Sequence, residues 1–277
     1  MRRFFIFGLG YSAARIAALF ADEGWDVIST GRDGTLDFGD GGNVRLALAD
    51  SSHVLSCVPP GGDGGDPVLD TYGDALAGKG LSYLSSTGVY GDTGGAWVDE
   101  TAPTGTGRRT ARAAADARWL AMGARVFRLP GIYGPGRSAL ERVALGRAHR
   151  IDLPGQVFSR VHVDDIASGV FTAQSAPAGA YNLADDLPCG QNEVIELACR
   201  LLGREAPPLQ TLDQAGLSPM ARGFYAENRR VANGKAKRVL GWKPGYSDYV
   251  TGLRALSAMT SPASASADPA PASTDQR

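Results

Sequence analysis

The sequence predicts an α/β fold, in which a doubly wound parallel sheet carries helices on both faces. Short apolar runs alternate along the chain with amphipathic stretches, and a glycine-rich turn follows the first run. Strands and helices in alternation are typical of parallel sheets. With 277 residues and 43% hydrophobic residues, the chain can bury a sizeable core. The net charge of −1 gives no electrostatic reason to expect binding to nucleic acid or to an anionic membrane.

The first strand, turn and helix predict a dinucleotide site. The apolar run Phe4–Phe7 leads into a turn of the form GxGxxA, and residues 12–22 follow with apolar side chains at helical spacing. In such a turn the first glycine permits the bend, and the second lets the backbone approach a pyrophosphate. The helix N-terminus offers free N–H groups to the phosphates. We therefore predict a Rossmann fold that binds NAD(P) at Gly8, Leu9, Gly10, Tyr11, Ser12 and Ala13; the alternative is a turn that binds no ligand.

The end of the second predicted strand, residues 26–30, indicates which cofactor is preferred. NAD-selective sites place an acidic residue about 20 residues past the glycines, on the ribose hydroxyl. Here that position is Thr30, and Arg32 follows shortly after. A guanidinium can fork onto a 2′-phosphate, and a threonine can add a hydroxyl. We predict NADP, with Thr30 and Arg32 as contacts; NAD stays open as the alternative, with Arg32 solvated and Asp33 in the role of the acid.

The remaining elements extend the sheet and add a smaller C-terminal part. A short strand is expected at residues 35–38, within a loop-rich stretch. Further strands are predicted at 53–58, 81–85, 125–129 and 181–183, and helices at 68–79, 108–122, 137–148, 165–174 and 193–202. We expect one Rossmann-type unit over 1–260, whose small C-terminal substrate subdomain comes mainly from 177–250. Residues 261–277 contain mainly Ser, Ala, Pro and Asp, and we expect them to be disordered.

Cysteine usage and the N-terminus bear on location and metal binding. Cys57, Cys189 and Cys199 form no CxxC pair, which indicates a reducing compartment and no metal site. The sequence has no apolar stretch long enough for a membrane span, and its first apolar run ends in the glycine turn without a cleavage site. We therefore expect a cytoplasmic protein with no membrane or nucleic-acid partner. Nothing in the sequence predicts the oligomeric state.

Four further motifs follow the glycine turn. They are SSTGVYG at 85–91, RLPGIYGPG at 128–136, HVDDIA at 162–167, and the segment 233–244 with NGKA and LGWKP. In this order they resemble the extended or atypical short-chain dehydrogenases/reductases of the NAD-dependent epimerase/dehydratase group, over residues 1 to about 250. The resemblance implies a nicotinamide cofactor and a small-molecule substrate. It places Ser86 at the position of the catalytic Ser/Thr and brings the nicotinamide against Pro130, Gly131 and Ile132.

Several motif residues can also be interpreted from their local sequence, without the family resemblance. Ser85 and Ser86 end a strand at its carboxyl edge, where doubly wound sheets bind ligands; alternatively, they satisfy backbone groups of the turn. We include Ser85 among the cofactor contacts. Asp164 and Asp165 precede an apolar helix and are better explained as N-caps than as catalytic acids. Residue 233 is expected to cap a short helix that ends at Gly241. For His162 we favour a structural role over proton transfer.

The catalytic helix departs from the resembled family. That family uses a Tyr-x-x-x-Lys pair, in which the phenol exchanges a proton and the lysine holds the ribose. Here Arg108 takes the tyrosine position and Arg112 the lysine position. A guanidinium cannot exchange a proton near neutral pH. Arg112 can still hold the ribose or a phosphate, while the proton must come from the substrate, from water or from Tyr133.

Two function classes follow. The first is an NADP-dependent oxidoreductase or epimerase-like enzyme with Ser86 and Tyr133 as catalytic residues. Its substrate would be anionic or sugar-like, because arginines are expected around it at Arg108, Arg109, Arg112 and Arg160. A solvated helix face is the alternative explanation of that arginine cluster. The second class is a non-catalytic NADP-binding sensor or regulatory protein.

Overall fold

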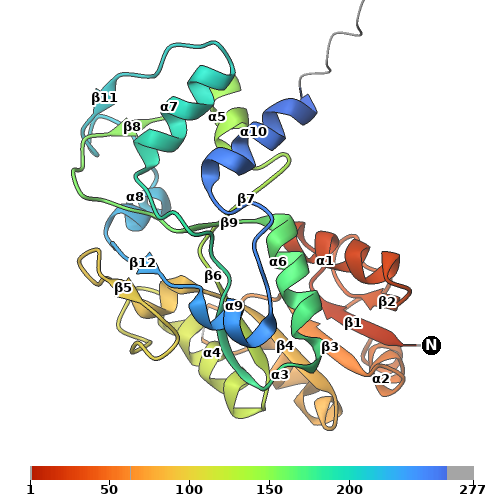
Figure 1. Cartoon of the computed structure of the whole chain (residues 1–277). Coiled ribbons are helices and arrows are strands. Elements are labelled where there is room, and N and C mark those ends of the chain that lie inside the picture. The colour runs from red at the N-terminus through yellow and green to blue at the C-terminus, as the bar shows by residue number, and fades with distance from the viewer. Residues whose placement is uncertain (1, 63, 261–277) are drawn as a thin grey trace, which may run out of the picture.

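The computed structural model describes residues 2–62 and 64–260. Its centre is a six-stranded parallel sheet in the order β10-β6-β4-β3-β1-β2 (Figure 1), which confirms the predicted doubly wound α/β class. The strand order reverses between β1 and β3, and such switch points leave a crevice at the carboxyl ends of the strands. The strands are β1 (Arg3–Phe7), β2 (Asp26–Ser29), β3 (His53–Ser56), β4 (Gly80–Ser86), β6 (Arg125–Leu129) and β10 (Gly179–Asn182).

Alternating side chains of β1 divide between the two faces of the sheet. Phe4 and Ile6 pack with one set of helices, and Phe5 and Phe7 pack with the other. A strand buried on both faces explains why the first apolar run is continuous. The first set comprises α1 (Tyr11–Asp22), α6 (Val163–Thr172) and α9 (Gly234–Leu240), and the second comprises α2 (Gly41–Ala49), α3 (Pro67–Tyr72) and α4 (Thr110–Ala121).

A second layer covers the carboxyl edge of the sheet and lies above it in Figure 1. Helices α5 (Ala139–Ala144), α7 (Gln191–Leu201) and α10 (Tyr249–Thr260) share one apolar cluster there. Two short parallel ladders link this layer to the sheet, β7 (Gly131–Tyr133) with β9 (Arg160–His162) and β5 (Trp97–Val98) with β12 (Arg230–Val231). The layer also contains β8 (Arg150–Ile151), β11 (Leu209–Gln210) and α8 (Pro219–Tyr225). Three 3₁₀ helices are η1 (Gly73–Leu76), η2 (Thr87–Tyr90) and η3 (Ala173–Ser175).

Some predicted elements were wrong. Instead of a strand at 35–38, the structure has a single bridge between Thr30 and Leu36. The unpredicted helix α2 follows, capped by Asp40, which accepts from the N–H of Asn43. The helix expected at 137–148 is shortened to α5, which begins only after a capping box of Ser138 and Glu141 and ends at Ala144. The expected tail at 261–277 lies outside the described residues.

The caps also differ in part from the prediction. Gly241 ends α9 in the left-handed conformation, as expected, with φ 64°. The N-cap of α6 is His162, whose Nδ1 accepts from the N–H of Asp164. Asp165 instead accepts from two backbone N–H groups of the segment after α9, and Asn233 uses its side chain to donate to the Ala184 carbonyl. Among the described residues, no helix has the length and apolar character needed to cross a membrane.

One buried ion pair ties α4 to the sheet. Arg128, on β6, donates to both carboxylate oxygens of Asp116 on α4, at 3.0 and 2.7 Å. Their side chains are only 4% and 1% exposed. Ser85 adds a third hydrogen bond to Asp116 at 2.6 Å, and Arg128 also donates to Tyr90, which in turn donates to Asn182. This network joins α4, β4, β6, η2 and β10 through groups whose burial is compensated.

Replacing Arg128 by Met should leave the Asp116 carboxylate buried in the core without its charged partner. We expect the free energy of unfolding, measured by urea denaturation at neutral pH, to fall by about 3–5 kcal/mol. Arg118→Met is the matched control, because Arg118 on the same helix pairs with Asp70 at the surface. That control should cost about 1 kcal/mol or less. Equal losses in the two variants would contradict a special role for the buried pair.

Candidate active site

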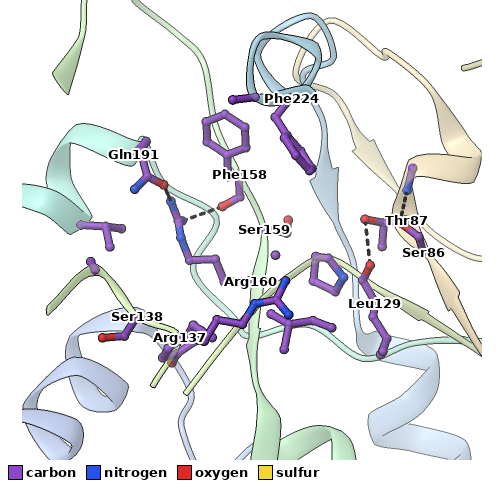
Figure 2. A pocket seen from close by; sticks show the side chains of 18 of the residues that line it. Ser86, Thr87, Leu129, Arg137, Ser138, Phe158, Ser159, Arg160, Gln191 and Phe224 are labelled. Atoms are coloured by element: carbon purple, nitrogen blue, oxygen red, sulfur yellow. Dashed lines mark hydrogen bonds between the residues drawn. The ribbon is translucent and has the colours of Figure 1, made fainter. Parts of the chain in front are cut away.

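A cavity of about 980 Å³ opens between the carboxyl edge of the sheet and the second layer. It runs from the glycine turn past the ends of β4 and β6 toward α5, α7 and α8, and Figure 2 shows part of its wall. Most residues predicted from the sequence line this one cavity: Gly8, Gly10, Tyr11, Ser12, Ala13, Ser85, Ser86, Arg112, Pro130, Gly131, Ile132 and Tyr133. Leu9, Thr30 and Arg32 lie outside its lining.

The glycine turn forms an open cradle at the start of α1. Gly8 has φ 84°, and the N–H groups of Gly8 and Leu9 both donate to the Thr30 carbonyl, at 3.1 and 2.7 Å. Gly10 precedes the helix, whose first N–H groups have no intrahelical acceptor and no side-chain cap. A Cβ on Gly10 would meet nothing within 4 Å. Open space against a helix N-terminus fits the pyrophosphate of a dinucleotide.

Thr30 and Arg32 flank this cradle in different ways. Thr30 is 1% exposed, and its hydroxyl accepts from the N–H of Gly8 at 3.3 Å, so it holds the turn in place. Arg32 is exposed. It follows Gly31, where a Cβ would come within 2.8 Å of the Leu9 nitrogen, so the backbone carrying Arg32 passes directly beside the turn. Contacts of both residues with a cofactor stay predictions.

The two adjacent serines at the end of β4 face different surroundings. The hydroxyl of Ser85 is buried and donates to Asp116, so Ser85 supports the core network. Ser86 is half-buried at the cavity wall, and its Oγ accepts from the N–H of Gly88 at 3.1 Å. Because this bond uses Ser86 as an acceptor, the hydroxyl proton can still be donated to a ligand.

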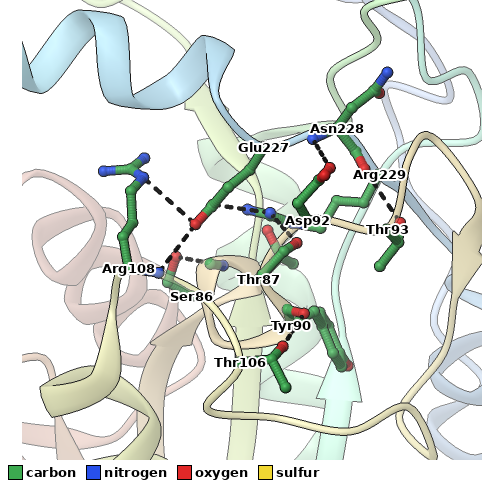
Figure 3. A network of polar contacts seen from close by, with 12 residues as sticks. Ser86, Thr87, Tyr90, Asp92, Thr93, Thr106, Arg108, Glu227, Asn228 and Arg229 are labelled. Atoms are coloured by element: carbon green, nitrogen blue, oxygen red, sulfur yellow. Dashed lines mark hydrogen bonds and ion pairs between the residues drawn. The ribbon is translucent and has the colours of Figure 1, made fainter.

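Arg112 and Arg108 are both held by the protein. Arg112 donates to the Tyr83 hydroxyl at 2.7 Å and to the Leu84 carbonyl at 3.3 Å, at the end of β4. Arg108 pairs with Glu227 at 3.5 Å, and Glu227 also accepts from Arg229 at 2.9 Å (Figure 3). The position predicted to replace the catalytic tyrosine is therefore tied to the segment after α8.

Arg109, between these two, is a cavity residue to which the sequence gave no separate role. It is the N-cap residue of α4 and is half-buried. A Cβ on Gly88 would lie 2.5 Å from its Cδ, so the side chain lies across the turn that Ser86 caps. Among the described residues its guanidinium has no recorded hydrogen bond or ion pair. Burial, together with Arg108 and Arg112, lowers the pKa of Arg109.

Neither Tyr133 nor Tyr90, the tyrosine of the SSTGVYG motif, is free to act at Ser86. The Tyr133 hydroxyl donates to the Asp248 carbonyl at 3.4 Å, and its ring packs edge-on against His162. Burial and the nearby Asp185 carboxyl raise the pKa of Tyr133 far above its usual range. Tyr90 is engaged in the core network, and burial raises its pKa as well. This geometry favours a packing role for Tyr133 over the predicted proton transfer.

The far end of the cavity is also rich in arginine. Arg160 is occupied by the protein, because it donates to the Phe158 carbonyl at 2.8 Å, to Cys189 Sγ at 3.1 Å and to Gln191 at 3.1 Å (Figure 2). Arg142 and Arg147 line the cavity without an ion pair among the described residues, and so does Arg137, whose guanidinium lies beside the glycine turn, 5.6 Å from the Tyr11 ring. The sequence did not predict these arginines as cavity residues, because they lie in short segments that are distant from Arg108 in the chain.

Comparison with known proteins bears on the class of this chain. No family model matches the sequence. A curated relative from a Streptomyces species, named 3-diazoavenalumate denitrifying reductase, is 31% identical over 140 residues. The match covers 46% of this chain and 45% of the relative, so the chain spans less than half of the curated protein that it matches.

Solved structures match over nearly the whole chain. A functionally unknown conserved protein from Silicibacter pomeroyi is 39% identical, with 94% of this chain and 99% of the other covered and a TM-score of 0.83. A dTDP-glucose 4,6-dehydratase from Bacillus anthracis, solved with NAD, is 18% identical over 93% and 96% of the two chains, with a TM-score of 0.71. A human epimerase family protein, solved with NADPH, is 17% identical over 92% and 99%, also at 0.71.

These neighbours define the class of the fold. The protein has the Rossmann-type fold of the NAD-dependent epimerases and dehydratases, which confirms the resemblance predicted from the motifs. It belongs to one family with the Silicibacter protein, given their identity over almost all of both chains.

Behind the cavity wall, Asp185 is a buried acid without a normal hydrogen bond. It is 2% exposed, and neither carboxylate oxygen has a partner of ordinary geometry among the described residues. Burial raises its pKa to about 7, and the nearby Arg160 guanidinium offsets only part of this effect. The native state therefore binds a proton here that the unfolded chain releases near pH 4.

Asp185→Asn should change how stability depends on pH. Between about pH 4 and 7 the unfolded chain has lost this proton while the native state still holds it, so the stability of the wild type falls as pH rises and the full penalty is present above about pH 7. The variant should match the wild type near pH 4 and exceed it at pH 8 by on the order of 2–4 kcal/mol. Urea denaturation at both pH values measures this. The exposed neighbour Asp186 supplies the control, Asp186→Asn; parallel pH profiles for Asp185→Asn and wild type would contradict the assignment.

Proposed function

We propose that this protein is an NADPH-dependent reductase of small carbonyl compounds that carry an anionic group. One observation carries the proposal: a cavity joins an open helix N-terminus at Gly10 to the Ser86 hydroxyl, and its walls include arginines that have no ion-pair partner among the described residues. The first end suits a pyrophosphate, the second a reacting oxygen, and the walls a negatively charged substrate. Fold neighbours solved with NAD and with NADPH support a nicotinamide cofactor.

The cofactor would lie along the carboxyl edge of the sheet. The N–H groups at the start of α1 would hold the pyrophosphate, and Arg32 the 2′-phosphate. Arg112, fixed at the end of β4, would face the ribose, with the nicotinamide against Pro130, Gly131 and Ile132. When bound, the reduced nicotinamide supplies a hydride.

The side chains around Ser86 favour reduction over epimerisation. An epimerase or dehydratase first oxidises an alcohol, which requires a base to remove the hydroxyl proton. Arg108, Arg109 and Arg112 cannot serve as that base near neutral pH. In a reduction, the carbonyl, NADPH and one proton give the alcohol and NADP⁺. The Ser86 hydroxyl would orient the carbonyl oxygen, and solvent in the open cavity would supply the proton.

The name of the Streptomyces relative also favours reductase chemistry, since that protein is called a reductase. A second candidate is an NADP-binding sensor without turnover. The observation that favours it is the absence of any tyrosine from α4, the helix that carries the catalytic pair in the resembled family. Both candidates require cofactor binding, and they differ in whether the bound cofactor is ever oxidised.

Arg32→Glu should weaken NADPH binding much more than NADH binding. Losing a charge-assisted contact and adding a carboxylate beside the 2′-phosphate should cost on the order of 1–3 kcal/mol for NADPH. NADH lacks that phosphate and should bind almost as before. Titration calorimetry with both cofactors measures the difference. Equal losses for the two would remove the argument for NADP.

Ser86→Ala should lower turnover and leave NADPH affinity nearly unchanged. The hydroxyl would act on the reacting oxygen, so its loss should reduce the rate about tenfold or more. The assay is stopped-flow oxidation of NADPH with a panel of keto acids, keto-sugars and aldehydes. Ser82→Ala, on the same strand, is the control. If NADPH binds but no substrate oxidises it, the sensor replaces the enzyme; if Ser86→Ala retains full turnover, the role of Ser86 is wrong.

A further inference from the structure

We propose that Arg109 is a catalytic residue of this site, stabilising the negative charge that develops on the substrate oxygen and so replacing electrostatically what a tyrosine would supply by proton transfer. The proposal rests on the reductase function above. Arg109 is the neighbour of Arg108, the residue that takes the position of the family's tyrosine in the sequence.

The geometry brings Arg109 and Ser86 around one point. The position that a Cβ of Gly88 would occupy lies 3.1 Å from Arg109 Nε and 3.3 Å from Ser86 Oγ. Both residues line the cavity, and both atoms lie on the side of Gly88 where a Cβ would point. Only glycine at position 88 allows the Arg109 side chain to lie this close to the turn. These distances place the donor of Arg109 and the donor of Ser86 near each other at the end of β4, so that one carbonyl oxygen bound beside them in the cavity would be within reach of both.

The neighbouring arginines are unavailable for this role. Arg108 pairs with Glu227, and its guanidinium stacks on the ring of Phe224 at 4.9 Å. Arg112 is fixed on Tyr83 and Leu84. The guanidinium of Arg109 makes no hydrogen bond or ion pair among the described residues, and it lies 5.7 Å from the ring of Phe224. Of the three, Arg109 alone has no guanidinium donor already engaged by the described residues.

The positive charge around Arg109 favours the binding of an anion. Arg109 begins α4, so the partial positive charge of the helix N-terminus adds to its own. Glu227 is the acidic residue at this end of the cavity lining, and two arginines already engage it. A half-buried guanidinium among like charges is unfavourable without a counter-ion. An oxygen that becomes negative during the reaction supplies that counter-ion when the barrier is crossed.

The chemistry balances without a proton from Arg109. Hydride from NADPH forms a new C–H bond at the carbonyl carbon, the C=O π electrons move to the oxygen, and NADP⁺ remains. The guanidinium of Arg109 and the hydroxyl of Ser86 donate hydrogen bonds to the resulting alkoxide. Solvent water then protonates the alkoxide, and buffer neutralises the hydroxide formed. Arg109 keeps its proton and charge throughout.

A phenol probe tests the oxyanion site without knowledge of the substrate. We would titrate 4-nitrophenol with the protein, with and without NADP⁺, and follow its ionisation by absorbance. The wild type should bind the phenolate at least about tenfold more tightly than the phenol, since oxyanion donors favour the charged form. Arg109→Gln should abolish this preference, and Arg109→Lys should retain part of it. Arg118→Gln, on the exposed face of α4, should behave as the wild type.

The results with these variants decide whether Arg109 forms the oxyanion site. A phenolate preference that Arg109→Gln removes, with NADPH affinity and melting temperature unchanged, supports the proposal. A wild type without preference, or a preference that survives in Arg109→Gln and disappears in Arg142→Gln at the far end of the cavity, overturns it. If NADPH fails to bind while the phenolate preference depends on Arg109, the reductase function falls and the oxyanion site stands. With a substrate in hand, Arg109→Gln should lower kcat about 100-fold or more and leave the Kd of NADPH unchanged.

Discussion

The buried pair between Asp116 and Arg128 is the interaction on which the site depends. It fixes α4 against β6, and through Ser85 it fixes the same helix against the end of β4. The angle at which α4 begins is set by this contact, and with it the direction of Arg109 and Arg112. An unpaired charge at either position would destabilise the native state strongly, because both side chains are buried away from water. Trp119, which stacks on Tyr83 and donates to Asp66, holds the same helix nearer its C-terminal end.

Much of the scaffold could be predicted from local patterns. Strand β6 was predicted to the residue, and β1 and β4 nearly so, because buried parallel strands read as continuous apolar runs. The turn Gly8–Ala13 was identifiable because its residue types are required by backbone geometry. Helix α2 was missed, since Gly41 and Gly42 at its start resemble loop, and its stability comes from an Asp40 cap and from packing of Val44 and Leu48. Tertiary contacts override local preference there.

The chemistry of the site was harder to predict than the fold. The motifs brought Ser86 and the glycine turn to one edge, and both line the same cavity. They could not tell Arg108 from Arg109, because that distinction depends on Glu227, more than a hundred residues away in sequence. One signal was present: Arg128 stands in the middle of an apolar strand, and a buried charge requires a partner. The partner, Asp116, is the one acidic residue of α4.

Helix α8 and the segment after it give the three arginines at the start of α4 different roles. Glu227 engages Arg108, and Phe224 lies over both Arg108 and Arg109, while Arg112 is already held at the end of β4. Folding therefore satisfies two of three like charges and leaves the third at the cavity wall. The unfavourable free energy of that third charge is relieved only when a ligand places negative charge beside it. A ground-state carbonyl does so weakly and an alkoxide strongly, so the same arrangement that is unfavourable in the empty cavity favours the transition state of hydride addition over the bound substrate.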